Sequence, residues 1–347
     1  MAKDTLTTTK IDVALQGGGA HGAFTWGVLD RLFRDETIAI GALSGASAGA
    51  MNAVVAASGL VRGGNAAARE DLRIFWTAVN DAARRASPFL PIFDPINAWL
   101  RASSRWIDTF TAGRTSFTAS PIAGLPAQDM LRRILSDVID FDALRRPEAP
   151  RLFIAATHVQ TGLARIFTNE ELTPDVLLAS ACLPTVFPPV TIDGEDYWDG
   201  GFAANPPVMQ LIENTETRDL VLVTINPYRR LGTPRLATDI PDRISELTFN
   251  QSLLAELRAI AMLKEEFRDD PSSCRSSIVA SVANLRFHEI NNEEAMGEFD
   301  PMSKLFPSWS LLTELHGIGE RTTAHWLRKN RAQLGQSSTA QLSERFG

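Results

Sequence analysis

The sequence predicts an α/β fold with a central, mostly parallel sheet and helices on both faces. Two strand-loop-helix units follow one another within residues 11–57, and parallel neighbouring strands need helical crossovers of this kind. The 347 residues are 44% apolar and 22% charged, as in an ordinary globular protein. A chain of this length can bury a large core.

Apolar periodicity gives the expected elements in order. Strands are expected at 11–15, 38–43, 152–156, 163–167 and 220–225. Helices are expected at 22–34, 48–57, 128–139, 173–182, 243–267 and 309–329. Loops at 16–19 and 44–47 join the first strands to their helices.

One stretch, residues 37–61, carries no charge and is long enough to span a bilayer. Only eight of its 25 residues are Leu, Ile, Val or Met, so insertion into lipid would gain little free energy. We interpret it as a buried strand, a turn and a buried helix.

The chain shows no internal repeat and no linker, so we expect one domain over 10–330. A helical, lid-like insertion is expected at about 84–125, where an apolar stripe alternates with arginines. Such a stripe faces either the core or a lipid interface. The polar residues 333–347 are expected to form a frayed tail.

The net charge, the cysteines and the N-terminal residues limit which partners and which cellular compartment are expected. The formal net charge is −7, which argues against nucleic acid as a partner. Cys182 and Cys274 are far apart, so neither a disulfide framework nor a cysteine-rich metal site is expected. The first sixteen residues lack the features of a secretory signal. We therefore expect a cytoplasmic protein.

A glycine-rich loop leaves the first strand and enters the first helix. Its spacing Gly17-x-Gly19-x-x-Gly22 matches the dinucleotide fingerprint. That site also needs a carboxylate at the end of the second strand, whereas Glu36 precedes this strand. The exposed N–H groups of the loop could equally hold a phosphate or a reaction oxyanion.

A G-x-S-x-G elbow follows the second strand. It runs from Gly45 to Gly49 around Ser47, just before a helix. Such a turn lifts a serine hydroxyl clear of the backbone. The N–H of Ala48, one residue after the serine, could bind an oxyanion.

A third motif places Asp199 before Gly200 and Gly201. Alone, an Asp followed by two glycines is more often only a turn. Together with the triple glycine and the elbow, in this order, it resembles the patatin-like phospholipases, a family of serine acyl hydrolases. The segment 179–190 also looks like the one that precedes the Asp in that family. The resemblance covers about 11–225.

The resemblance implies a patatin-like three-layer fold and a Ser-Asp dyad rather than a triad. It implies Ser47 as nucleophile, Asp199 as base and cleavage of carboxylic esters through an acyl-enzyme, with no cofactor and no metal. A lipid or other acyl ester is the implied substrate, with peripheral membrane contact compatible with it; the oligomeric state stays open. The expected oxyanion-hole residues are Gly17, Gly18, Gly19 and Ala48, and the supporting motif residues are His21, Gly22, Gly45, Gly49, Gly200 and Gly201.

The chain departs from that family at two positions. Many relatives have Asp where this chain has Gln16, and Arg or Lys where it has His21. The loop's backbone donors are unaffected, but a fixed positive charge beside the oxyanion is lost. His21 would supply charge only at lower pH; we expect it to pair locally in the loop.

Three other functions compete with this interpretation. The first is an α/β-hydrolase with a Ser-Asp-His triad, because His288, His316 or His325 would complete it in a permitted order. The second is a dinucleotide-dependent oxidoreductase that uses Gly17, Gly19 and Gly22. The third is a non-catalytic scaffold, although both the nucleophile and the base are retained.

Overall fold

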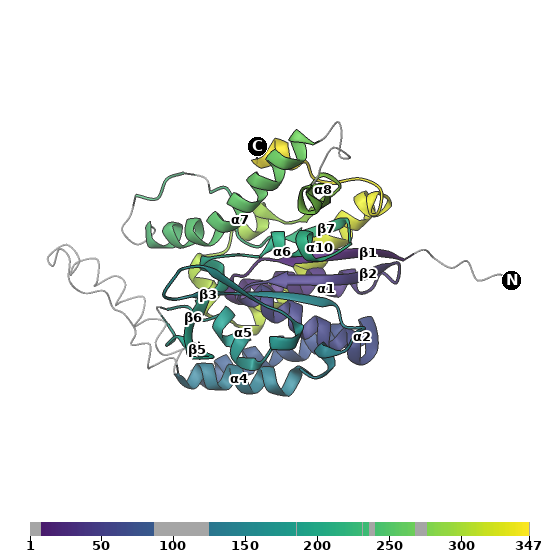
Figure 1. Ribbon diagram of the computed structural model, residues 1–347. Coiled ribbons are helices and arrows are strands. Elements are labelled where there is room, and N and C mark those ends of the chain that lie inside the picture. Colours follow the sequence, from purple (N-terminus) through teal and green to yellow (C-terminus); the bar gives the residue numbers. More distant parts are fainter. Residues whose placement is uncertain are drawn as a thin grey trace.

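The computed structural model describes residues 8–86, 125–184, 186–230, 232–235, 240–267 and 276–346 (Figure 1). Within these ranges, eight strands form one mixed sheet. They are β1 (Thr9–Leu15), β2 (Ile38–Gly45), β3 (Arg151–His158), β4 (Ala164–Phe167), β5 (Val190–Ile192), β6 (Glu195–Asp199), β7 (Asp219–Val223) and β8 (Arg286–Ile290).

The strand order brings the two expected site loops together. It runs β5-β6-β3-β2-β1-β7-β8, and β4 also pairs with β3. The strands β3, β2, β1, β7 and β8 are parallel, whereas β4, β5 and β6 pair antiparallel to their neighbours. Because parallel strands end at one edge, the loops after β1 and β2 meet there.

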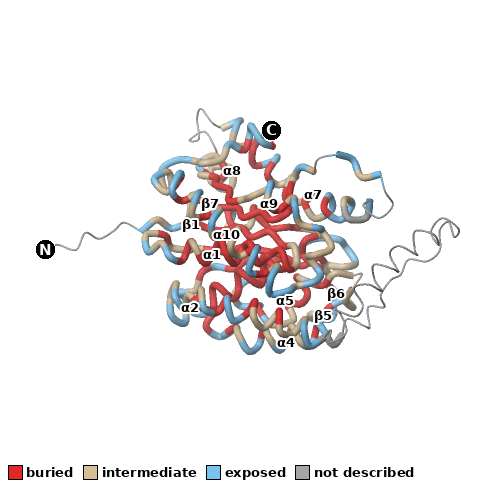
Figure 2. Tube along the Cα trace, turned by 180° about the vertical axis from the view of Figure 1, so that it is seen from behind, coloured by how far each residue is buried: buried red, intermediate tan, exposed pale blue. Residues whose placement is uncertain are grey.

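Helices cover both faces of the sheet, which confirms the expected fold class (Figure 1). Alternate residues of β1 enter different cores: Val13 and Leu15 pack with α1, α2, α4, α5 and α10, and Ala14 packs with α6, α7, α8 and α11. Figure 2 shows the buried residues running through the middle layer. The helices are α1 (Gly22–Leu32), α2 (Ala48–Ala86), α4 (Leu125–Val138), α5 (Pro174–Ser180), α6 (Val208–Asn214), α7 (Ile240–Glu266), α8 (Ser277–Ala283), α9 (Glu293–Gly297), α10 (Trp309–Asn330) and α11 (Leu342–Phe346).

Every strand and helix expected from periodicity occurs, and most ends shift by a few residues. The exception is the helix expected at 48–57, which continues as α2 to Ala86 with a kink at Gly63 and Gly64. The uncharged stretch 37–61 holds β2, the elbow and the start of α2, as expected. No helix in the described ranges has both the length and the apolar character to cross a membrane. The expected insertion at about 84–125 lies outside the described residues, apart from its ends at 84–86 and 125.

Two expectations for less regular segments are wrong or incomplete. The hairpin β5-β6 was not expected, although Asp193 and Gly194 both adopt the positive φ of a two-residue hairpin turn. The tail at 333–347 is not frayed where it is described. Leu342 and Phe346 of α11 are buried in the core beside α7. These two residues form an apolar face on α11, which the mostly polar composition of the segment did not indicate.

Candidate active site

Ser47 lies at the tip of the elbow between β2 and α2. Its φ is +53°, a left-handed conformation that is costly for a residue with a side chain. The strained turn is held from outside the elbow, because the Ser47 N–H donates to the Ser180 hydroxyl at 3.0 Å and to the Ser180 carbonyl at 3.1 Å. Ser180 itself is fully buried at the end of α5.

Asp199 reaches the same place at the end of β6. This strand pairs antiparallel with β3, with Asp199 opposite Ala156, and β3 lies beside β2. The Asp199 N–H donates to the Cys182 carbonyl at 2.8 Å. One carboxylate oxygen, Oδ1, accepts from the Gly201 N–H at 2.7 Å, and the Ser47 side chain lowers the pKa of the carboxyl as a hydrogen-bond donor does. The two residues of the expected dyad therefore interact.

The environment of Asp199 changes its acidity. Burial raises the pKa of its carboxyl from 3.8 to about 7, although the hydrogen bonds from Gly201 and Ser47 act in the opposite direction. An ordinary carboxylate titrates near pH 4 and is a weak base toward a serine hydroxyl. The buried Asp199 is a stronger base, and desolvation is the physical cause.

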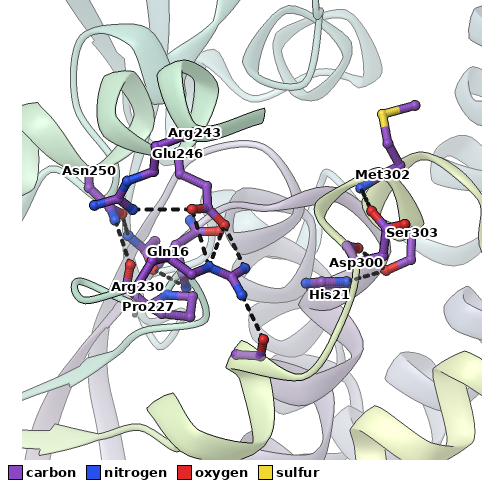
Figure 3. Close-up of polar contacts among 12 residues, drawn as sticks. Gln16, His21, Pro227, Arg230, Arg243, Glu246, Asn250, Asp300, Met302 and Ser303 are labelled. Atoms are coloured by element: carbon purple, nitrogen blue, oxygen red, sulfur yellow. Dashed lines mark hydrogen bonds and ion pairs between the residues drawn. The ribbon is translucent and has the colours of Figure 1, made fainter. Parts of the chain in front are cut away.

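The glycine loop is anchored at its first residues by side-chain amides. The Gly17 N–H donates to Asn205 Oδ1 at 2.7 Å, and the Gly17 carbonyl accepts from Asn226 at 3.0 Å. Gln16, where many relatives have Asp, accepts from the N–H groups of Ile225 and Asn226, both at 2.9 Å. Its amide nitrogen donates to Asn250 Oδ1 at 2.9 Å (Figure 3).

These contacts correct the expected set of oxyanion donors. The N–H of Gly17 is already engaged by Asn205, so Gly17 does not have a donor to offer. Among the described residues, no acceptor binds the N–H of Gly18, Gly19 or Ala48. Gly18 and Gly19 are partly exposed, and Ala48 begins α2, where the first N–H groups of a helix lack partners within it.

The other motif glycines allow close packing around the dyad. A Cβ on Gly22 would lie 2.6 Å from the Ala48 side chain, and one on Gly45 would lie 2.6 Å from the Ala50 nitrogen. A Cβ on Gly200 would meet the Ala155 carbonyl at 2.1 Å, and one on Gly201 would meet the Phe249 ring at 2.3 Å.

The side chain of His21 pairs outside its own loop, which corrects that expectation; only its backbone N–H pairs locally, with the Gly18 carbonyl at 3.2 Å. Its Nε2 lies 2.7 Å from the Ser303 hydroxyl, 282 positions along the chain (Figure 3). Burial lowers the pKa of His21 from 6.5 to about 3, helped by the nearby charges of Lys304 and Arg230. The ring is neutral at ordinary pH, so it does not replace the cation that many relatives carry.

The histidines of the competing triad have other partners. His288 bonds Asp219 and Thr339, each at 3.0 Å. His316 packs on Trp26, with ring centroids 4.1 Å apart, and His325 is exposed on α10. The dinucleotide alternative still lacks its carboxylate, because β2 ends at the elbow. Neither alternative gains support from these positions.

Cys182, whose carbonyl binds Asp199, lies beside the site. Cys182 is free and fully buried, and burial together with the Asp199 charge raises the pKa of its thiol to about 12. The thiol therefore remains protonated, and the hydrogen bond to the Asp199 N–H is accepted by the Cys182 carbonyl. Within the described ranges, no cluster of three His, Cys, Asp or Glu side chains could hold a metal ion.

The sequence interpretation missed the positioning contacts of five residues: Asn205, Asn226, Asn250, Ser180 and Ser303. Asn205 was signalled by the rigid Asn-Pro-Pro run after the Asp199 motif. Asn226 follows the expected strand at 220–225, at the edge where sites form. Ser180 lies in the segment 179–190 that resembles the family, but nothing local pointed to its partner, 133 positions away. Asn250 and Ser303 have no local signal, and their partners are 234 and 282 positions away.

One of three comparisons with known proteins identifies the family. No curated protein sequence matches the chain. The crystal structure of VipD from Legionella pneumophila aligns with 97% of this chain and 72% of its own, at 12% identity and a TM-score of 0.37, a likeness too low to carry an argument. The sequence model described as patatin-like phospholipase matches residues 13–212, which include Ser47, Asp199 and the glycine loop. The chain therefore belongs to the patatin-like phospholipase family, whose members are lipid acyl hydrolases.

Proposed function

We propose that this protein is a phospholipase A or lysophospholipase that works through a Ser47-Asp199 dyad. The observation that carries the proposal is the interaction of the Ser47 side chain with the buried Asp199 carboxyl, whose pKa burial raises to about 7. Beside them lie the N–H groups of Gly18, Gly19 and Ala48, which have no acceptor among the described residues. A nucleophile, a base and oxyanion donors are the parts that acyl transfer needs.

In the proposed reaction, Ser47 Oγ attacks the ester carbonyl carbon while its proton passes to Asp199. The N–H groups of Gly18, Gly19 and Ala48 stabilise the negative oxygen of the tetrahedral intermediate. When the carbon-oxygen bond to the alcohol breaks, Asp199 returns the proton to the departing oxygen. Water then attacks the acyl-enzyme through the same steps and releases the fatty acid.

A panel of substrates tests this proposal. The purified protein is incubated with phosphatidylcholine, lysophosphatidylcholine, a neutral glyceride and chromogenic esters of short and long acyl chains. We expect release of fatty acid from the phospholipids and hydrolysis of the chromogenic esters. A protein that hydrolyses none of these esters would refute the proposal.

The buried base predicts how the rate depends on pH. Below its pKa of about 7, Asp199 is protonated and cannot accept the Ser47 proton. We expect kcat/KM for a soluble ester to rise with a slope of one proton up to about pH 7 and to level off above pH 8. A rate that is already constant from pH 5 to pH 8 would contradict a raised pKa at Asp199.

We propose that the protein meets membranes peripherally, through apolar side chains beside the site. On α7, Ile244 is 58% and Leu247 is 48% exposed; near the glycine loop, Phe306 is 51% exposed. Both segments adjoin the site. Phe249 of α7 packs on Phe202 with ring centroids 4.9 Å apart, just after Asp199, and the Lys304 backbone contacts the glycine loop.

The double variant Ile244→Glu, Leu247→Glu tests this contact. We expect at least a tenfold loss of activity on phospholipid vesicles, since two apolar side chains no longer enter the interface. The kcat/KM for a soluble short-chain ester should stay within twofold. Met262→Glu, at a 72% exposed position of the same helix, is the matched control and should keep both activities. Equal vesicle activity in the double variant and the control would refute this surface.

A further inference from the structure

A segment outside the matched family region crosses the glycine loop. Residues 298–306, here called the C-terminal strap, include the 3-10 turn η7 (Pro301–Leu305), which packs against the turn η1 (Gly19–His21). A Cβ built on Gly19 would come within 2.3 Å of the Lys304 carbonyl oxygen. The strap backbone is therefore in direct contact with a proposed oxyanion donor.

One side-chain hydrogen bond joins the strap to the loop, and its direction follows from proton counting. The Ser303 hydroxyl lies 2.6 Å from the Asp300 carbonyl, to which it donates its only proton. Toward His21, at 2.7 Å, Ser303 can then only accept. His21 must carry its proton on Nε2 and donate it, as a neutral ring can. The His21 ring also meets the edge of Phe299, with centroids 5.7 Å apart.

The strap is anchored on its other side to α7. Arg230 Nη1 donates to the Gly297 carbonyl, just before the strap, at 2.6 Å. Arg230 also pairs with Glu246 of α7 at 2.6 Å, and Arg243 reaches the same carboxylate at 3.2 Å. Figure 3 shows this cluster near Gln16 and, apart from it, the contact between His21 and Ser303. The strap is thus fixed relative to both α7 and the loop.

The two ends of the glycine loop are held in different ways. Gln16 and Gly17 are fixed by buried amides of Asn205, Asn226 and Asn250. Beyond Gly17, Gly18 packs closely on Ile225, and the strap contacts the loop at Gly19 and at His21. The position of the strap therefore contributes to the orientation of the Gly18 and Gly19 N–H groups.

We propose that His21 and Ser303 are positioning residues, whose hydrogen bond lets the C-terminal strap aim the Gly18 and Gly19 N–H groups at the reaction oxyanion. This proposal rests on the proposed acyl hydrolase function. It adds that Ser303, which lies outside the matched family region, contributes to the stabilisation of the transition state. Because the contact is between neutral groups, its effect does not depend on pH over the range in which the enzyme works.

The test uses the full chain and the variants Ser303→Ala, Ser303→Thr, His21→Phe and the double variant His21→Phe, Ser303→Ala. We measure kcat and KM for a soluble ester, and the inhibition constant of a trifluoromethyl ketone. Ser47 Oγ adds to the carbonyl of this ketone, its proton passes to Asp199, and the adduct oxygen becomes an oxyanion. An inhibitor of this kind reports oxyanion binding separately from substrate binding.

We expect Ser303→Ala and His21→Phe each to lower kcat about tenfold with KM within twofold, and to raise the inhibition constant about tenfold, less than the loss of a whole donor. The double variant should match the single ones, because all three lack the same bond. Ser303→Thr keeps the acceptor and should stay within twofold of wild type. Ser136→Ala, which removes a hydroxyl bonded within α4, is the control and should leave both constants unchanged.

Three results separate the possible failures. Unchanged kcat in both single variants would overturn the positioning role while leaving the hydrolase function intact. A lower kcat with an unchanged inhibition constant would also overturn it, because the loss would not act on the oxyanion. If Ser303→Ala does not fold, His21→Phe decides by the same criteria, and Ser303→Thr serves as the variant that keeps the hydrogen bond. A wild-type protein that hydrolyses no ester would refute the underlying function instead.

Discussion

Replacing Asp199 with Asn is expected to lower kcat by about 10⁴-fold or more while the protein stays folded. Asn fills nearly the same volume, and its side-chain oxygen can still accept from the Gly201 N–H. What it cannot do is take the Ser47 proton. Ser47→Ala, which removes the nucleophile, should cause a loss of similar size, and the double variant should lose no more than either single one, because the two residues act in one step.

A stability measurement accompanies this activity assay. Burial raises the pKa of Asp199 to about 7 from its ordinary 3.8, so the unfolded chain releases this proton more readily than the folded one. The contribution of Asp199 to stability therefore falls as the pH rises from about 4 to about 7. Asp199→Asn removes this pH-dependent decrease in stability and should raise the unfolding temperature at pH 8. An inactive variant that is also less stable at pH 8 would show that Asp199 is a structural group.

Gly49→Ala is expected to damage both stability and activity. A Cβ on Gly49 would lie 2.1 Å from the Leu15 carbonyl oxygen and 2.8 Å from its carbon, so β1 and the elbow must move apart. Overpacking of this kind costs about 2 kcal/mol or more. The same movement separates the glycine loop, which follows Leu15, from Ser47, and a displacement of about 1 Å at a reacting group lowers rates about 100-fold.

The matched control for this substitution is Gly317→Ala in α10. Its Cβ would approach only the end of the flexible Arg321 side chain, at 3.1 Å, and Ala favours a helix over Gly. We expect unchanged activity and equal or higher stability for this variant, measured by thermal unfolding and by ester hydrolysis. Equal behaviour of the two variants would mean that the close contact between β1 and the elbow is not needed.

The core of the fold and the two residues of the proposed dyad could be identified in the sequence because their signals are local. The period of apolar residues marks β1, α1, β2 and α10, and the elbow carries its own turn chemistry from Gly45 to Gly49. Asp199 was found by motif order, although the strand that carries it was not. The sequence of β6, Glu-Asp-Tyr-Trp-Asp, is short and lacks the alternation of polar and apolar residues that marks a strand, and the Asp193-Gly194 turn before it was overlooked.

The supports of the site could not be predicted, since they depend on which distant segments the sheet brings together. Gln16 illustrates this. Its amide oxygen accepts from the Ile225 and Asn226 N–H groups, and its amide nitrogen donates to Asn250. Gln16 therefore links segments that are more than 200 positions apart in the sequence. The C-terminal third, which is outside the matched family region, supplies Asn250 and Ser303 to the loop. No spacing rule links such residues in advance.

Covalent labelling with a fluorophosphonate tests the dyad most directly. The reagent phosphonylates an activated serine, and peptide mapping by mass spectrometry locates it. We predict one label per chain, at Ser47, formed at a rate that rises with pH through about 7 and is abolished in Asp199→Asn. Label at any other serine, or ester hydrolysis that continues while Ser47 stays unlabelled, would contradict the assignment of the nucleophile.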